Sequence, residues 1–346
     1  MKKIAILLLV ALCIGIFAGC AGDVVVIGGC TCPTGSHNTP TNPQPSQPAV
    51  EGALKTGLAI VANTTGSENG KLADYDVTLV AVLVDDEGII RDCIIDSIGA
   101  KVEFDATGTI TSDITAQVKT KNELGDSYGM VAWGGAVAEW YQQADALAQF
   151  AIGKTVTELK NGAIDASGKA PAGSDLASSA TIYLGGYVSA IEVAVIFSKH
   201  LGAQGGDELR LAAMPSLKSS TSGTAQLDCD VTALTVNSGA ITSCYIDSLQ
   251  AKVNFGTDGV ITGGISEAVE TKNQLGDKYG MVAWGGAIAE WNTQAASFAA
   301  YVTGKTAADV AGIAVDAGTK PTGVDLVSSV TIAIGGFQAL LAKALA

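Results

Sequence analysis

The chain contains an internal repeat, which constrains its fold more than any other feature of the sequence. The segment TKNELGDSYGMVAWGGA that begins at Thr120 returns as TKNQLGDKYGMVAWGGA from Thr271, which is 151 residues later. Near the C-terminus the spacing between matching positions falls to 150, as for Asp175 and Asp325. We therefore place two copies of one domain at residues 51–201 (copy one) and 207–346 (copy two). The glycine-rich residues 202–206 between them predict a short flexible joint.

The first half of each copy has the residues of β-strands. In copy one, Asp76–Val84 is apolar and β-branched, and Asp85–Gly88 has the composition of a turn. Strands are then expected at Ile89–Ile95 and Ala100–Phe104, with a further turn at Thr107–Gly108. Short apolar runs separated by Asp and Gly favour a meander of antiparallel strands.

The second half of each copy has helical periodicity. Apolar residues from Val137 to Ala151 follow the i, i+3, i+4, i+7 spacing, and Gly153 predicts the end of that helix. A final helix is predicted from Ser178 toward Lys199, with its counterpart from Ser328 to the C-terminus. Strands followed by helices favour an α+β fold, with two tandem copies of a domain in which an antiparallel sheet precedes the helices.

Residues 1–19 have the order of a secretory signal peptide. Basic Lys2 and Lys3 precede an apolar run from Ile4 to Phe17, which is too short to span a bilayer. The small residues before Cys20 resemble the lipobox of bacterial lipoproteins, although Phe17 stands where Leu is commoner. The resemblance implies cleavage before Cys20 and attachment of lipid to its thiol, on the extracellular face of the cytoplasmic membrane. The alternative is an ordinary secretory signal.

Residues 20–50 are predicted to form a lipid-anchored tether. The stretch 32–48 consists largely of Pro, Thr, Asn, Ser and Gln, a composition that favours extended backbone and cannot bury a core. Cys30, Cys32 and His37 lie close together there, but a zinc site needs a further ligand. We predict no metal site, and a disulfide within the tether stays open.

Charge and histidine content exclude several classes of function. The net charge is −14, and removal of Lys2 and Lys3 with the signal makes it −16. Such a surface repels nucleic acid and anionic headgroups. The two histidines, His37 and His200, stand in unrelated contexts, which argues against histidine-based catalysis. The segment 153–155, Gly-Lys-Thr, is not a phosphate-binding loop, because the required earlier glycine is Ala148.

Cysteines and aromatic residues leave alternatives open. Cys93 and Cys244 occupy matching, buried strand positions, whereas Cys229 has no counterpart. A hairpin turning at residues 237–239 would bring Cys229 near Cys244 and allow a disulfide. Tryptophans and tyrosines that match between the copies either pack in cores or stack on a planar cofactor, and Trp140 and Trp291 are placed on a buried helix face. These residues are Trp133, Trp140, Trp284, Trp291, Tyr128 and Tyr279.

Each copy carries an Asp-x-x-Ser-Ser-x-Thr segment at the predicted start of its final helix. In copy one these residues are Asp175, Ser178, Ser179 and Thr181, and in copy two Asp325, Ser328, Ser329 and Thr331. Helix capping by Ser178 or Ser328 accounts for one serine per copy. The free N–H groups of a first helical turn also suit a phosphate, such as a phosphodiester on the threonine hydroxyl.

The segment resembles the attachment motif of FMN-binding domains, Asp-x-x-Ser/Thr-Gly-Ala-Thr/Ser. Ser179 and Ser329 stand where the motif has Gly, and Val330 where it has Ala. The segment LGDSYGM at residues 124–130 is also similar to FMN-binding lipoproteins of Gram-positive anaerobes. The resemblance implies that an FMN transferase joins FMN to Thr181 and Thr331 through a phosphoester. It also implies an extracellular electron carrier between a membrane donor and an outside acceptor, more than an enzyme with its own substrate.

A second function suits the acidic charge and the lack of catalytic residues equally well. The chain would then be a non-enzymatic cell-surface lipoprotein that binds a ligand or a protein without flavin. A hydrolase has little support, since no Ser-His-Asp set is available.

Overall fold

The computed structural model describes residues 52–346, so the predicted signal peptide, Cys20, the tether and the Cys30–Cys32–His37 cluster lie outside the described residues. Copy one folds into strands and then helices, as expected. Its elements are β1 (Lys55–Asn63), β2 (Leu72–Val84), β3 (Ile90–Glu103), α1 (Lys121–Leu124), η1 (Gly125–Tyr128), α2 (Met130–Gly134), α3 (Trp140–Ala151), α4 (Val156–Ala163), α5 (Asp175–Ser179) and α6 (Gly185–Ile196).

Copy two repeats this order. Its elements are β4 (Glu208–Ser216), β5 (Thr224–Asn237), β6 (Ala240–Phe255), β7 (Ile261–Gly263), α7 (Lys272–Leu275), η2 (Gly276–Tyr279), α8 (Met281–Gly285), α9 (Trp291–Val302), α10 (Ala307–Ala311), α11 (Val324–Val327) and α12 (Gly335–Ala344). Both sheets are antiparallel meanders, with strand orders β1-β2-β3 and β4-β5-β6-β7. The prediction of an α+β fold in two similar units is confirmed.

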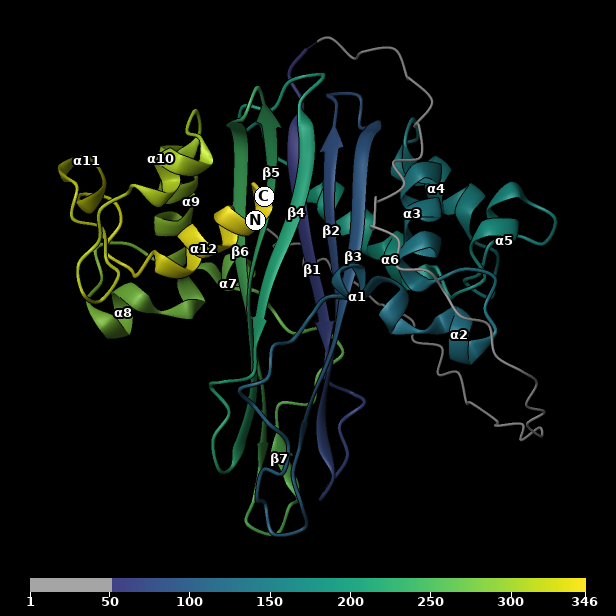
Figure 1. Cartoon of the computed structure of the whole chain (residues 1–346), viewed down its shortest axis with the longest axis horizontal. Coiled ribbons are helices and arrows are strands. Elements are labelled where there is room, and N and C mark those ends of the chain that lie inside the picture. The colour runs from purple at the N-terminus through teal and green to yellow at the C-terminus, as the bar shows by residue number, and fades with distance from the viewer. Residues whose placement is uncertain (1–51) are drawn as a thin grey trace, which may run out of the picture. The chain divides into compact units, whose positions relative to one another are not determined.

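The two sheets pack face to face, and the helices cover their outer faces. β1 lies against β5 and β6, while β4 lies against β2 and β3. Between the sheets the equivalent rings of Phe104 and Phe255 stack with centroids 4.0 Å apart. In Figure 1 the helices of copy one flank the sheets on one side and those of copy two on the other. The result is a helix–sheet–sheet–helix arrangement of layers.

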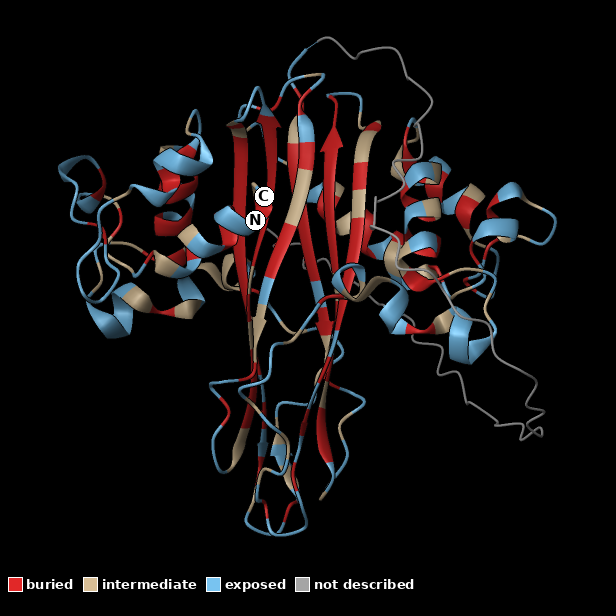
Figure 2. Cartoon of the chain, in the orientation of Figure 1, coloured by how far each residue is buried: buried red, intermediate tan, exposed pale blue. Residues whose placement is uncertain are grey.

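This layering explains the continuous apolar run in β2. Val77 and Leu79 face the other sheet, whereas Val80 and Val82 face the helices of their own copy. Both faces of the strand are therefore buried, and the strands are red along most of their length in Figure 2. A strand covered on both sides has no polar face, so its sequence shows no alternation.

Two local predictions differ from the structure. The expected strands at Ile89–Ile95 and Ala100–Phe104 form one strand, β3, because Asp96 and Gly99 between them stay paired with β2. The joint at residues 202–206 is anchored, since Ala203 is buried and its carbonyl accepts the N–H of Leu54. These contacts arise from the packing of the two copies, which the repeat alone does not reveal.

Candidate functional site

The predicted attachment threonine lies between two helices in each copy. The expected continuous helix from Ser178 to Lys199 is wrong: α5 ends at Ser179, and α6 begins only at Gly185. Thr181 lies in the break, as Thr331 lies between α11 and α12 in copy two. The break has a specific cause, because the N–H groups of Thr181 and Ile182 donate to a side chain of another helix instead of to helical carbonyls.

That side chain is Gln143, on the buried face of α3. Its Oε1 accepts the Thr181 N–H at 2.8 Å, the Thr181 hydroxyl at 3.2 Å and the Ile182 N–H at 3.1 Å. Its Nε2 donates to the carbonyl of Ala138 at 2.8 Å. The fully buried amide is therefore satisfied on both sides and holds the threonine segment in one position.

Copy two contains the same arrangement of a buried glutamine that holds the threonine segment, which we call the glutamine clamp. Gln294 Oε1 accepts the Thr331 N–H at 2.8 Å, the Thr331 hydroxyl at 3.2 Å and the Ile332 N–H at 3.2 Å. Its Nε2 donates to the Ala289 carbonyl. Neither glutamine stands out in the sequence as a candidate site residue. A polar residue at the same position of an otherwise apolar helix stripe in both copies is the signal that could have revealed them.

The expected capping by Ser178 and Ser328 is also wrong. Ser174 caps α5 by accepting the Ala177 N–H, while the Ser178 hydroxyl donates to the Asp175 carbonyl at 2.6 Å. In copy two Gly323 holds the cap position without a side-chain bond, and Ser328 ends the helix. Because α5 is so short, Ser178 falls in its last turn, where it cannot reach free N–H groups.

The motif residues lie together at the surface of each copy. Asp175, Ser178, Ser179 and Thr181 are exposed. Asp325 and Ser328 are also exposed, whereas Ser329 and Thr331 are partly covered. Figure 1 places α5 and α11, which precede the two threonines, on opposite sides of the paired sheets. The structure thus forms two separate sites, one per copy.

The start of α6 lies just after Thr181. The N–H groups of Leu184 and Gly185 donate to the Gly168 carbonyl at 2.8 and 3.0 Å. Those of Gly186 and Tyr187, in the first turn of the helix, find no acceptor within residues 52–346. Lys169 follows Gly168 and is exposed. Free helical N–H groups and a nearby cation suit a phosphate.

Aromatic residues divide into two classes. Trp140 and Trp291 are buried against the sheets, which confirms their prediction as core residues. Trp133 on α2 and Trp284 on α8 are instead exposed, and Tyr128 is partly exposed beside the ammonium of Lys121. Packing of each sheet against one helix face leaves the short α2 and α8 outside the core.

The possible Cys229–Cys244 disulfide is absent, and both residues are free thiols. Cys229 pairs with Leu249 across the hairpin, and Cys244 pairs with Leu234. Cys229 faces the other sheet, whereas Cys244 faces the helices of copy two. The hairpin register therefore keeps the two sulfurs on opposite faces of the sheet. Within residues 52–346, no cluster of potential metal ligands occurs.

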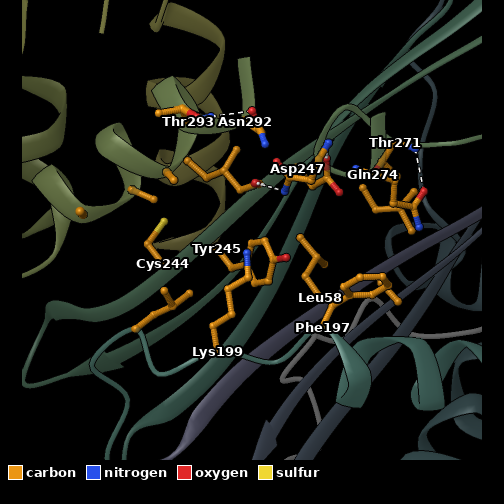
Figure 3. Close-up of a pocket in the computed structure, with 18 of the residues that line it drawn as sticks. Leu58, Phe197, Lys199, Cys244, Tyr245, Asp247, Thr271, Gln274, Asn292 and Thr293 are labelled. Atoms are coloured by element: carbon orange, nitrogen blue, oxygen red, sulfur yellow. Dashed lines mark hydrogen bonds between the residues drawn. The ribbon is translucent and has the colours of Figure 1, made fainter. Parts of the chain in front are cut away.

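A groove of about 930 Å³ lies between the copies, bordered by β1, the end of α6, β6 and α9. Figure 3 shows Lys199 beside the ring of Tyr245, with its ammonium 4.8 Å from the ring centroid. The equivalent place on the other edge of the sheets, related by the repeat, holds an ion pair between the copies: the Lys343 ammonium lies 2.6 Å from the Glu123 carboxylate. In the groove, Val193 stands at the position that matches Lys343, and Gln274 at the position that matches Glu123. This edge therefore lacks the ion pair.

Asp247 in this groove predicts a pH effect on stability. Burial raises its pKa to about 6, although the N–H groups of Ser248 and Asn273 donate to its carboxylate. In the unfolded chain the pKa of an aspartate is about 3.9. The contribution of Asp247 to the free energy of unfolding is therefore fully present below that pH and is lost as pH rises through the folded pKa. Asp247→Asn removes the titrating group and with it this loss. The free energy of unfolding of the variant, relative to that of wild type, should therefore rise by about 2 kcal/mol from pH 4 to 7.5.

Urea unfolding at both pH values measures this difference. Asp105→Asn is the control, because hydrogen bonds from Thr107 lower the pKa of the exposed Asp105, and its effect has the opposite sign. A difference between Asp247→Asn and wild type that is the same at both pH values would show that the carboxyl titrates normally.

Comparison with known proteins adds no identification: no family model, no curated protein and no solved structure matches the chain. Among the helices of residues 52–346, none has the length and apolar character needed to cross a membrane.

Proposed function

We propose that the protein is an extracellular lipoprotein electron carrier, with one FMN joined by a phosphoester to Thr181 and one to Thr331. The observation that carries the proposal is the duplicated threonine site, with the same buried glutamine holding the same hydroxyl in both copies. Bound flavin would supply one- and two-electron redox chemistry. The chain's own residues would supply attachment, orientation and electrostatic tuning.

The residues around Thr181 fit such an attachment. The hydroxyl lies at the surface, within reach of a transferase, and donates only to Gln143. Once the hydroxyl hydrogen is lost, the N–H groups of Thr181 and Ile182 still hold Gln143 in place. The start of α6 and Lys169 offer donors and positive charge for the phosphodiester.

Attachment requires an activated flavin donor. The threonine Oγ1 would form the new O–P bond while the pyrophosphate bond of a flavin dinucleotide breaks. The leaving nucleoside monophosphate accepts the bond electrons, and the hydroxyl proton passes to a base of the transferase. No residue of this chain has to act as acid or base in that step.

The sequence supports an anchored location for this carrier. Cleavage before Cys20 and lipid on its thiol would hold the protein at the extracellular face of the cytoplasmic membrane. The tether at residues 20–50 would then let the two flavin sites meet a membrane donor and an extracellular acceptor.

Intact mass after co-expression with an FMN transferase tests the proposal. Wild type should gain two FMN groups, Thr181→Val and Thr331→Val one each, and the double variant none. Valine keeps the shape of threonine and removes only the hydroxyl, so the fold should persist. Thr181→Ser, which keeps a hydroxyl, is the matched control and should retain attachment. Wild-type protein without FMN mass and without flavin fluorescence after denaturation would reject the proposal.

A further inference from the structure

Trp133 and Trp284 expose an unusual amount of aromatic surface. Trp133 is 86% exposed and Trp284 is 89% exposed, and they occupy equivalent positions on α2 and α8. Exposed Val131 and Val137 extend the first apolar surface, as Val282 and Ile288 extend the second. An apolar surface repeated in both copies, although neither core uses it, indicates a binding role.

A buried carboxylate holds each of these short helices in place. The two oxygens of Glu139 accept the N–H groups of Met130 and Val131 at 2.8 and 3.0 Å. Glu290 makes the same pair of bonds to Met281 and Val282. The helix N-terminus is thus already occupied by an anion, and the helix direction is set before any ligand arrives.

The backbone also positions each indole ring. A side-chain carbon added at Gly129 would lie 3.0 Å from the ring of Trp133, and one at Gly280 would lie 2.2 Å from that of Trp284. Both glycines have φ of 80°, in the left-handed region that favours glycine. Each ring therefore lies against its glycine, while most of its surface stays open. Such an open aromatic face fits a planar aromatic ligand, which can stack on it.

Each tryptophan segment is joined to an attachment threonine through one amide group. Gln143 donates to the carbonyl of Ala138, in the link between α2 and α3, and accepts from the N–H of Thr181, both at 2.8 Å. Gln294 joins Ala289 to Thr331 with the same distances. The loop that follows each tryptophan and the segment that carries each threonine therefore meet at one buried amide in each copy.

We propose that Trp133 and Trp284 are stacking platforms for the isoalloxazine rings of the FMN groups on Thr181 and Thr331. This inference rests on the proposed function and adds the residue that holds the ring. A phosphate on the threonine leaves the flavin tethered by its flexible ribityl chain, so an aromatic platform within reach of that chain would fix the ring. An anionic membrane surface suits these patches less, because the chain is strongly acidic.

Single-flavin variants test the proposal one site at a time. In the Thr331→Val background only Thr181 can carry flavin, so Trp133→Ala acts on that flavin and Trp284→Ala is the matched control. Stacking on indole quenches flavin fluorescence. Trp133→Ala should therefore raise the fluorescence of the folded protein about fivefold, the ratio of stacked to free rings that a typical aromatic contact supports. Trp284→Ala should leave it unchanged, and the Thr181→Val background should reverse the two results.

Intact mass separates the possible failures. Full attachment of FMN with no rise in fluorescence in Trp133→Ala, or with equal rises in both tryptophan variants, would overturn the platform and leave the proposed function standing. Wild-type protein without FMN would overturn both. Loss of folding is not a concern for these variants, since both side chains are almost fully exposed. Trp133→Tyr, whose phenol ring can also stack and donate an electron to excited flavin, should retain part of the quenching.

Discussion

Gln143→Leu should destabilise copy one by about 3 kcal/mol, because it removes an acceptor shared by three donors and leaves the Ala138 carbonyl without its partner. Leucine has a similar volume but offers no polar atom to the Thr181 segment. The free energy of unfolding in urea, compared at unchanged m-value, measures the loss. Gln294→Leu should have a comparable effect in copy two, where the same bonds occur.

Gln142→Leu is the control for this change. It substitutes the same residue type one position earlier on α3, where the side chain is exposed and accepts only the Glu139 N–H. Its cost should stay below about 1 kcal/mol. In the presence of an FMN transferase, Gln143→Leu should also reduce attachment at Thr181 but not at Thr331. A Gln143→Leu protein as stable as wild type would contradict the clamp.

Phe104→Ala should lower the free energy of unfolding by about 4 kcal/mol, since it empties the space of a fully buried ring at the contact between the copies. The ring stacks on Phe255 with an angle of 2° between the two planes. Because both sheets contribute to one core, the wild type and the variant should each unfold in a single transition. Urea unfolding followed by tryptophan fluorescence and by circular dichroism measures both features.

A double-mutant cycle isolates the contact between the two rings. After Phe104→Ala, the further change Phe255→Ala should cost less than it does alone, by about 1 kcal/mol for a stacked pair. Phe150→Ala on α3, where the ring is only partly buried, is the control and should be additive with Phe255→Ala. Two separated unfolding transitions in the wild type would show that the copies are independent domains.

The sequence by itself determined the duplication, the α+β class and the pairing of the two threonine segments between the copies. These features depend on local patterns: strand runs separated by Asp and Gly, a helical stripe that Gly153 ends, and short polar segments. It also identified the continuous apolar run of β2. The burial of both faces of that strand, one under the helices and one under the second sheet, emerged only from the structure.

Only the tertiary structure decided which distant residues meet. The break before α6 depends on Gln143, which is 38 residues from Thr181, and the local sequence there reads as one helix. The register of the β5–β6 hairpin separated Cys229 from Cys244, although their spacing allowed a bond. Trp133 and Trp140 carry the same side chain, and only packing placed one outside and one inside. Hydrogen bonds and burial between distant segments leave no periodic trace in the chain, so they appear only once the copies fold and pack together.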